Sequence, residues 1–181
     1  MTGNFMGDSI KGHLSNVPNQ QFVPGLKLHR QIDSFTDSHP LVVAAKKQVS
    51  NERRRFAGII SDMAFDHFLA CHWDQFYPQP LADFCRYCYE VLDRLEEQFP
   101  ANLKHSYHYM RRDNWLLEYQ QLTRIEQSLN NISLYRLKRQ PNSLYGSIVE
   151  VKRNYHSWEQ AFLDFYPQLI DYANQQIVTD H

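Results

Sequence analysis

The segment "KLHRQIDSFTDSHP" places four side chains that can bind a metal ion within eleven residues: His29, Asp33, Asp37 and His39. If residues 26–35 form a helix, His29 and Asp33 are four positions apart and share one face. The segment "GIISDMAFDHFLACHW" repeats this spacing with Asp62 and Asp66. Imidazole and carboxylate groups together bind Mn, Fe, Co or Zn, and carboxylate-rich sets favour Mn or Mg. The two segments therefore predict a divalent metal site built by two helices.

The surroundings of Asp62 and Asp66 strengthen this prediction, because apolar residues lie on nearly every side of their predicted helix. Such a helix tends to be buried, and a buried carboxylate is costly unless it is paired, hydrogen-bonded or bound to a cation. Two carboxylates on one helix face also repel each other. We therefore expect both side chains to be buried, with a cation that relieves the repulsion.

Each of these residues also has an ordinary structural explanation. The pair on the first helix could be a surface hydrogen bond, and Asp62 could pair with an arginine, either Arg30 or Arg55. Asp37 could cap the following helix. Two such pairs on two apolar helices within forty residues favour the metal site over these alternatives. Asp8, in "GNFMGDSIKG", is a further candidate ligand, although by itself it could be a turn residue.

Helices are the elements that must position these side chains. Glycine occurs only six times, four of them in the first 25 residues, and alternating strand patterns are hard to find. In "TDSHP", Asp37 or Ser38 is the expected cap and Pro40 suits a first helical turn. We expect an irregular segment 1–25, then helices at about 26–35, 40–49, 53–72 and 81–99, two between 100 and 129, and two or three between 143 and 177. The predicted fold class is all-α, with residues 1–181 forming a single compact helical bundle.

The composition excludes several classes of protein. The chain has 181 residues, of which 43% are hydrophobic, so a sizeable core is expected. No apolar run approaches the roughly 20 residues that span a bilayer, and no signal peptide is visible, so we expect a cytoplasmic location and no membrane partner. The formal net charge of −1 gives no general attraction to nucleic acid. The three cysteines are expected to be buried thiols in a reducing compartment.

Two basic segments stand out in this nearly neutral chain. They are either solvated surfaces or a binding surface for an acidic protein partner. Their members are Arg53, Arg54, Arg55, Arg136, Lys138 and Arg139.

Three segments, "GNFMGDSIKG", "LKLHRQIDSFTDSHP" and "RRRFAGIISDMAFDHFLACHW", together resemble the bacterial acyl carrier protein phosphodiesterase family. "DNWLLEY" and "FLDFYPQLIDYA" fit the same family, so the resemblance covers nearly the whole chain. Family members usually have a short apolar segment before the "GNFMGD" motif. This chain starts almost at that motif, so we expect the family's N-terminal segment to be missing.

The resemblance implies a fold distantly related to the HD-domain metal-dependent phosphohydrolases. It implies hydrolysis of the phosphodiester that joins 4′-phosphopantetheine to a serine of holo-acyl carrier protein, with 4′-phosphopantetheine and apo-acyl carrier protein as products. It also implies a divalent cation, Mn²⁺ in preference and Mg²⁺ as a substitute.

The family's motif positions can be assigned roles in this sequence. We assign the metal to His29, Asp33, Asp62 and Asp66, with Asp8 as the next candidate. Asp37 is assigned to orient or deprotonate the attacking water. His67 is assigned to protonate the departing serine oxygen, although on an ideal helix it points away from the face of Asp66. A supporting hydrogen bond or a core position is an equal alternative for His67.

The same resemblance gives the basic segments a partner, because acyl carrier protein is strongly acidic. Both segments become docking candidates, and Arg30, adjacent to His29, is a candidate phosphate ligand. Two other functions remain open. One is an HD-type phosphohydrolase that acts on a nucleotide or another small phosphoester, although no feature of the sequence indicates a base pocket. The other is a non-catalytic helical module that binds an acidic protein.

Overall fold

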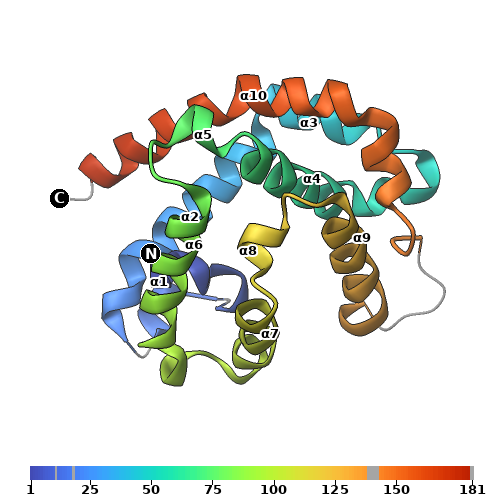
Figure 1. Ribbon diagram of the computed structural model, residues 1–181. Coiled ribbons are helices and arrows are strands. Elements are labelled where there is room, and N and C mark those ends of the chain that lie inside the picture. Colours follow the sequence, from blue (N-terminus) through green and yellow to red (C-terminus); the bar gives the residue numbers. More distant parts are fainter. Residues whose placement is uncertain (11, 18, 138–142, 180–181) are drawn as a thin grey trace.

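The computed structural model describes residues 1–10, 12–17, 19–137 and 143–179, and this part of the chain is helical without strands (Figure 1). Within these ranges, no helix has both the length and the apolar character that a membrane crossing requires. The α-helices are α1 (Thr2–Phe5), α2 (Val23–Ser38), α3 (Pro40–Lys47), α4 (Ala57–Cys71), α5 (Trp73–Phe76), α6 (Leu81–Asp93), α7 (Ala101–Arg112), α8 (Trp115–Glu118), α9 (Leu122–Asn131) and α10 (Ile148–Thr179). The all-α prediction is confirmed.

Helix α2 is longer at both ends than predicted, and this changes the position of Asp37. The helix runs through Ser38, so Asp37 lies in its last turn rather than in a loop. Neither Asp37 nor Ser38 caps α3, because both are still part of α2. Pro40 disfavours helical backbone at the residue directly before it, so the break between the helices falls at that residue. That residue, His39, is extended, and its Nδ1 accepts a hydrogen bond from the backbone N–H of Leu41 at 3.4 Å. The N-cap of α3 is therefore His39, one or two residues after the positions that were predicted.

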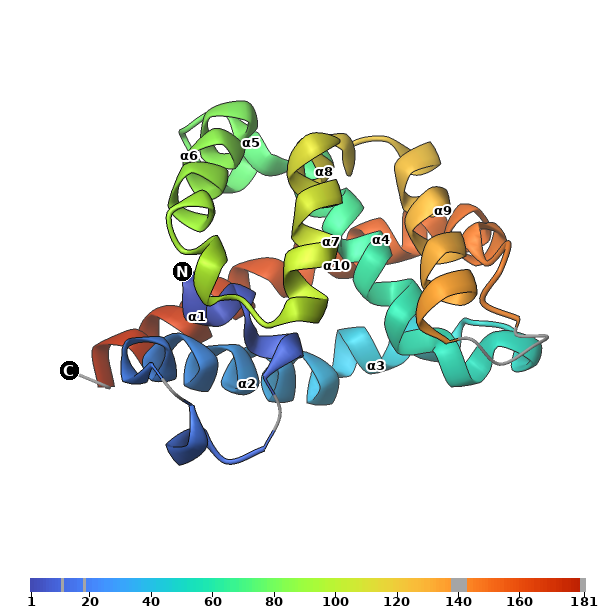
Figure 2. The ribbon, with the colours of Figure 1, turned by 90° about the horizontal axis from the view of Figure 1, so that it is seen from below.

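The chain after residue 143 forms one helix of 32 residues, α10, where two or three helices were expected. Pro167 lies inside it and removes one backbone donor. Helix α10 contacts α2, α3 and α4, and Phe165, Tyr166 and Leu169, on both sides of the proline, pack in or against the core. Figure 2 shows α2 and α3 following each other nearly in line, and Figure 1 shows α10 crossing one side of the molecule above α4.

The first 25 residues are less irregular than predicted, because they contain α1, three short 3-10 turns and the start of α2. Helix α1 packs against α2 through two glycines. A Cβ atom on Gly3 would meet the carbonyl oxygen of Phe22, and one on Gly25 would lie 2.8 Å from the backbone nitrogen of Asn4. Only hydrogen at these two positions lets the backbones approach so closely. This contact fixes the segment that carries Asp8 against α2.

The buried side chains form two clusters. One joins α3, α4, α9 and α10, and the other joins α1, the start of α2, α6 and α7. Cys85 and Cys88 of α6 are buried free thiols, as expected, whereas Cys71 is a free thiol that is exposed at the end of α4. The expectation of three buried thiols is therefore wrong for Cys71. The candidate site lies where α2, α4 and α10 meet.

Candidate active site

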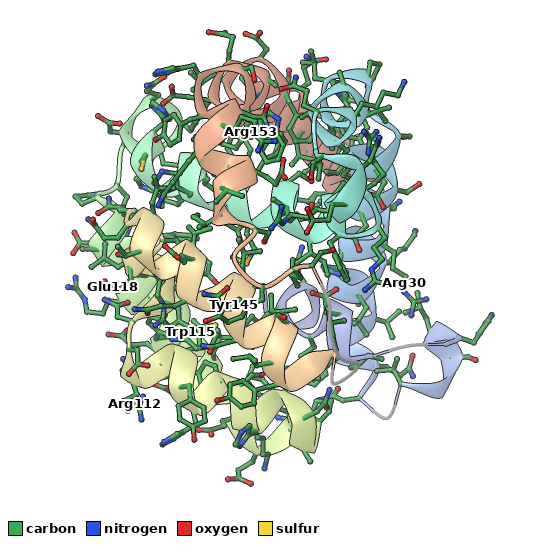
Figure 3. The ribbon with its side chains drawn as sticks, turned by 90° about the vertical axis from the view of Figure 1, so that its right-hand side faces the viewer. Arg30, Arg112, Trp115, Glu118, Tyr145 and Arg153 are labelled. Atoms are coloured by element: carbon green, nitrogen blue, oxygen red, sulfur yellow. The ribbon has the colours of Figure 1, made fainter. Side chains whose placement is uncertain are left out.

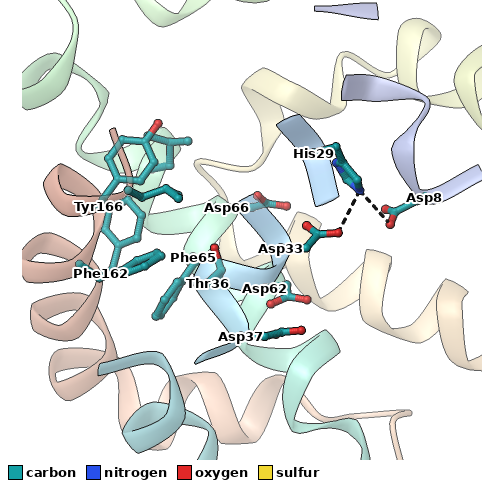
Figure 4. A pocket seen from close by; sticks show the side chains of 13 residues that line it. Asp8, His29, Asp33, Thr36, Asp37, Asp62, Phe65, Asp66, Phe162 and Tyr166 are labelled. Atoms are coloured by element: carbon teal, nitrogen blue, oxygen red, sulfur yellow. Dashed lines mark ion pairs between the residues drawn. The ribbon is translucent and has the colours of Figure 1, made fainter. Parts of the chain in front are cut away.

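One open pocket with a volume of about 400 Å³ brings together six of the predicted site residues (Figure 4). They are Asp8, His29, Asp33, Asp37, Asp62 and Asp66. The remaining lining side chains are Thr36 and the apolar Phe65, Leu69, Phe162, Phe165, Tyr166 and Leu169. Residues far apart in the sequence therefore converge as predicted, and the carboxylates of α2 and α4 open into the same space.

His29, Asp33 and Asp8 form the tightest group in this pocket. The Nε2 atom of His29 lies 3.1 Å from Oδ2 of Asp33 and 3.6 Å from Oδ1 of Asp8. One ligand atom from each of the three residues lies within 4.8 Å of the other two. The hydrogen bond that His29 donates to Asp8 raises the pKa of His29, and the charges of Asp33 and Asp8 add to this effect. One imidazole and two carboxylates at this spacing form a donor set that fits a divalent cation.

The group depends on a glycine that approaches the imidazole. Asp8 lies in a 3-10 turn, Gly7–Ser9, that packs against α2. A Cβ atom on Gly7 would overlap the ring of His29. The glycine in "MGD" therefore lets the acidic residue next to it come within 3.6 Å of Nε2 of His29. The sequence contained this signal, because a glycine directly precedes the candidate ligand.

Asp62 and Asp66 enter the pocket from successive turns of α4. The other faces of α4 are buried in the core, for example at Ile60 and Phe68, but both carboxylates are accessible from the pocket. The expectation of fully buried carboxylates is therefore wrong, because the apolar residues around them cover the remaining faces of the helix. Desolvation by the pocket walls raises the pKa of Asp62 to about 6. Desolvation, followed by the charge of Asp62, raises the pKa of Asp66 to about 7.

The cations of the protein lie mostly outside this pocket. No arginine or lysine lines it among the described residues, so an Arg30 or Arg55 pair with Asp62 is not found. Lys46 forms an ion pair of 2.6 Å with Asp37 at the edge of the site and is the cation whose charge lowers the pKa of Asp62. Burial also raises the pKa of Asp33 above its ordinary value. The pocket is therefore strongly acidic, with little internal neutralisation.

His67 does not reach the pocket, which corrects its assignment as the proton donor. Its side chain is buried on another face of α4, where Nδ1 lies 2.8 Å from the carbonyl oxygen of Tyr119 and Nε2 lies 3.0 Å from the hydroxyl of Tyr155. Burial lowers its pKa. Consecutive helical residues point about 100° apart, so Asp66 and His67 cannot face one cavity. His67 instead connects α4 to α10 and to the segment that follows α8.

The predicted phosphate ligand Arg30 also lies outside the pocket. Its Nη2 donates to the carbonyl oxygen of Gly12 at 2.8 Å and approaches that of Ile10 at 3.4 Å. Figure 3 shows Arg30 on a different part of the surface from Arg153 of α10. Arg30 therefore holds the segment after Asp8 against α2 and does not line the pocket, so a phosphate-binding role is not supported.

The first basic segment contains one largely buried arginine and two exposed ones. The side chain of Arg53 is only 17% exposed, and its Nη1 lies 3.5 Å from the fully buried carboxylate of Glu150. Arg54 and Arg55 are exposed on the same 3-10 helix, Asn51–Phe56. Of the second basic segment, Arg136 ends a π-helix, and Lys138 and Arg139 lie outside the described residues.

The apolar side of the pocket was not predicted from the sequence. Helix α10 supplies Phe162, Tyr166 and Leu169 at spacings of four and three residues, which place them on one face. This spacing was visible in the sequence. It is also the spacing of any helix stripe that packs in a core, so the pattern alone could not assign these residues to a site.

An all-α chain in which carboxylates and one imidazole converge in an open pocket has the donor groups of a metal-dependent hydrolase. The chain matches the family model of acyl carrier protein phosphodiesterase over residues 1–169. Relatives with that name include proteins of Pectobacterium atrosepticum (33% identity, 97% of this chain and 91% of the relative), Serratia proteamaculans (33%, 97% and 91%) and Photorhabdus laumondii (30%, 97% and 88%). The chain belongs to the acyl carrier protein phosphodiesterase family. No solved structure matches it, so the HD-like architecture stays a prediction.

Proposed function

We propose that this protein hydrolyses the phosphodiester of holo-acyl carrier protein and releases 4′-phosphopantetheine and apo-acyl carrier protein. Membership of the family supports this substrate. The observation that carries the proposal is the convergence of the motif residues from three separate segments in a single acidic pocket. A structural role for these residues would not require their carboxylates to share one open space at the cost of mutual repulsion.

In this proposal Asp8, His29 and Asp33 hold a divalent cation, Mn²⁺ in preference and Mg²⁺ as a substitute. Their donor atoms already lie within 4.8 Å of one another, and two of the three groups are carboxylates. When bound, such a cation supplies a nucleophile at neutral pH and offsets negative charge on the phosphoryl oxygens. A phosphodiester is itself an anion, and without positive charge this pocket would repel it.

The other carboxylates complete the site. Asp62 and Asp66 are the proposed additional ligands, because they face the pocket and desolvation raises the pKa of both carboxyl groups. A bound cation would offset this cost of keeping them ionised. Asp37 is the proposed residue that orients or deprotonates the attacking water. Its ion pair with Lys46 involves Oδ1 and holds the carboxylate at the edge of the pocket.

We propose that the carrier protein docks beside the 3-10 helix Asn51–Phe56. Arg54 and Arg55 are exposed there, and the hydroxyl of Ser143 donates to the carbonyl oxygen of Glu52 at 2.7 Å, which brings the segment before α10 to the same place. Arg153 of α10 adds a third exposed guanidinium (Figure 3). An acidic carrier protein would be steered to this surface by its charge. The unpaired thiols support the cytoplasm as the proposed location.

The decisive experiment incubates holo-acyl carrier protein with the purified protein and Mn²⁺ and follows the mass of the carrier. Loss of the 4′-phosphopantetheine mass is the expected result. If the carrier keeps this mass in the presence of chelator, or with Asp33→Asn, the reaction depends on the proposed site. Turnover of nucleotides or small phosphodiesters without any change in the carrier would support the alternative phosphohydrolase. Neither reaction, together with no metal uptake, would leave a helical binding module.

A further inference from the structure

The pocket has an apolar wall that the acidic residues do not explain. We define the apolar wall as the partly exposed Leu69 of α4 and Tyr166 and Leu169 of α10, supported from behind by the buried Phe65, Phe162 and Phe165. Figure 4 shows Phe162 and Tyr166 on the opposite side of the pocket from Asp8 and His29. The wall contributes nothing to binding a cation, so it is available to the organic part of a substrate.

Aromatic contacts make this wall rigid. The rings of Phe162 and Tyr166 stack with their centroids 5.1 Å apart, and the ring of Phe65 meets Phe162 edge-on at 5.6 Å. The hydroxyl of Tyr166 is hydrogen-bonded to that of Tyr77 at 2.9 Å. The wall therefore presents a preformed carbon surface whose one hydroxyl group already has a partner.

The wall begins one helical turn from the carboxylates. Leu69 follows Asp66 by three residues on α4, so the two side chains share a face and lie about 4.5 Å apart along the axis. A group that contacts Leu69 while a phosphoryl group lies near Asp66 must therefore be within a few bonds of phosphorus. This constraint selects the part of the substrate that the wall can contact.

In 4′-phosphopantetheine, the carbon attached to the ester oxygen is bonded to a quaternary carbon that carries two methyl groups. We propose that the apolar wall binds this gem-dimethyl group and thereby selects pantetheinyl esters among phosphodiesters. The inference rests on the proposed function. The two methyl groups would bury apolar surface against Leu69 and Leu169. A nucleotide would instead place ribose hydroxyl groups there, and they would lose hydrogen bonds with water without gaining a partner.

Calorimetric binding of free 4′-phosphopantetheine to the Mn²⁺-loaded protein tests the wall without any turnover. The matched ligand is the same molecule with both methyl groups replaced by hydrogen. We expect the natural ligand to bind about 10–100-fold more tightly, since a single methylene in an apolar pocket changes recognition about 10–200-fold. Equal affinities, or no binding of the natural ligand, would overturn the inference.

Variants then locate the effect. Leu169→Ala should reduce the ratio between the two affinities at least threefold. Leu163→Ala, a partly buried leucine of the same helix that does not line the pocket, should leave the ratio unchanged. An unchanged ratio in Leu169→Ala and in Leu69→Ala would overturn the role of the wall. The two proposals can be separated by attaching each of the two ligands, natural and without methyl groups, to the carrier protein. Hydrolysis of both carrier forms at equal kcat/KM would support the phosphodiesterase activity and contradict the role of the apolar wall.

Discussion

Gly7 lies against the imidazole of His29 so closely that a methyl group on Gly7 would overlap the ring. The contact places Asp8, the next residue, 3.6 Å from Nε2 of His29. The glycine is therefore a positioning residue for the proposed cation ligands, although it carries no ligand atom itself.

Gly7→Ala should weaken Mn²⁺ binding at least tenfold, because the added methyl group must push the imidazole or the Asp8 turn aside. The free energy of unfolding should fall by about 1–3 kcal/mol, the usual effect of overpacking. Calorimetry and chemical denaturation measure these two quantities. The matched control is Gly58→Ala, where a Cβ atom meets nothing within 4 Å and helix α4 should be slightly stabilised. Normal Mn²⁺ affinity in Gly7→Ala would show that the approach is not needed.

Asp33→Asn and Asp66→Asn should each reduce turnover of holo-acyl carrier protein by more than about 100-fold. Loss of a supporting partner alone typically costs 10–100-fold, and a direct ligand should cost more. Far-ultraviolet circular dichroism should stay close to that of the wild type, because both side chains open into the pocket. Asp171→Asn, on the exposed surface of α10, is the control and should keep full activity. Near-normal rates in both pocket variants would remove these residues from the site.

The metal-free protein should lose stability as pH rises from about 4 to 7, through the titration of Asp66. Its pKa is about 7 in the folded protein against an ordinary value of 3.8. Between these values the folded state keeps a proton that the unfolded state releases, so rising pH favours unfolding. Asp66→Asn removes this effect, and its Tm should therefore increase relative to the wild type between pH 5 and pH 8 in chelator. A Tm difference that is the same at both pH values would contradict the raised pKa.

Arg54→Glu combined with Arg55→Glu should raise KM for holo-acyl carrier protein and weaken its dependence on salt, with little change in kcat. Exposed complementary charges act mainly on the rate of encounter. Steady-state kinetics at several salt concentrations test this directly. Arg86→Glu combined with Arg94→Glu, two exposed arginines of α6 and its C-terminal end, gives the same change in net charge and is the control. If KM and its salt dependence were the same in the double variant, the carrier would have to dock elsewhere.

The proposed cation site was predictable because its chemistry depends on local spacing. His29 with Asp33 and Asp62 with Asp66 are four residues apart, and this separation places each pair on one face whatever the tertiary structure. That the two pairs share a pocket follows from packing between α2 and α4, which no local pattern contains. The expectation that they meet came from the cost of burying unpaired carboxylates on two apolar helices, and the likeness to a known family agreed with it.

The errors have equally specific causes. His67 was assigned as proton donor from its place in the family motif, and the alternative of a supporting or core position is the one that its contacts with Tyr119 and Tyr155 favour. Arg53 looked like part of a surface charge run, but its partner Glu150 is 97 residues away in the chain. The apolar wall was missed because a stripe that lines a cavity and one that packs in a core have the same periodicity.

Helix α10 links the proposed docking surface to the proposed substrate wall without a break. Glu150, which pairs with Arg53, and Phe162 are twelve residues apart on this helix, or about 18 Å along its axis. The helix thus sets a fixed distance between the surface where the carrier protein would dock and the wall where its phosphopantetheine group would bind. One inserted residue would rotate the wall relative to the docking surface by about 100°. Seven inserted residues would restore their relative orientation but lengthen the helix by about 10 Å. Insertions and deletions should therefore be tolerated in the connecting loops and selected against along this stretch of α10.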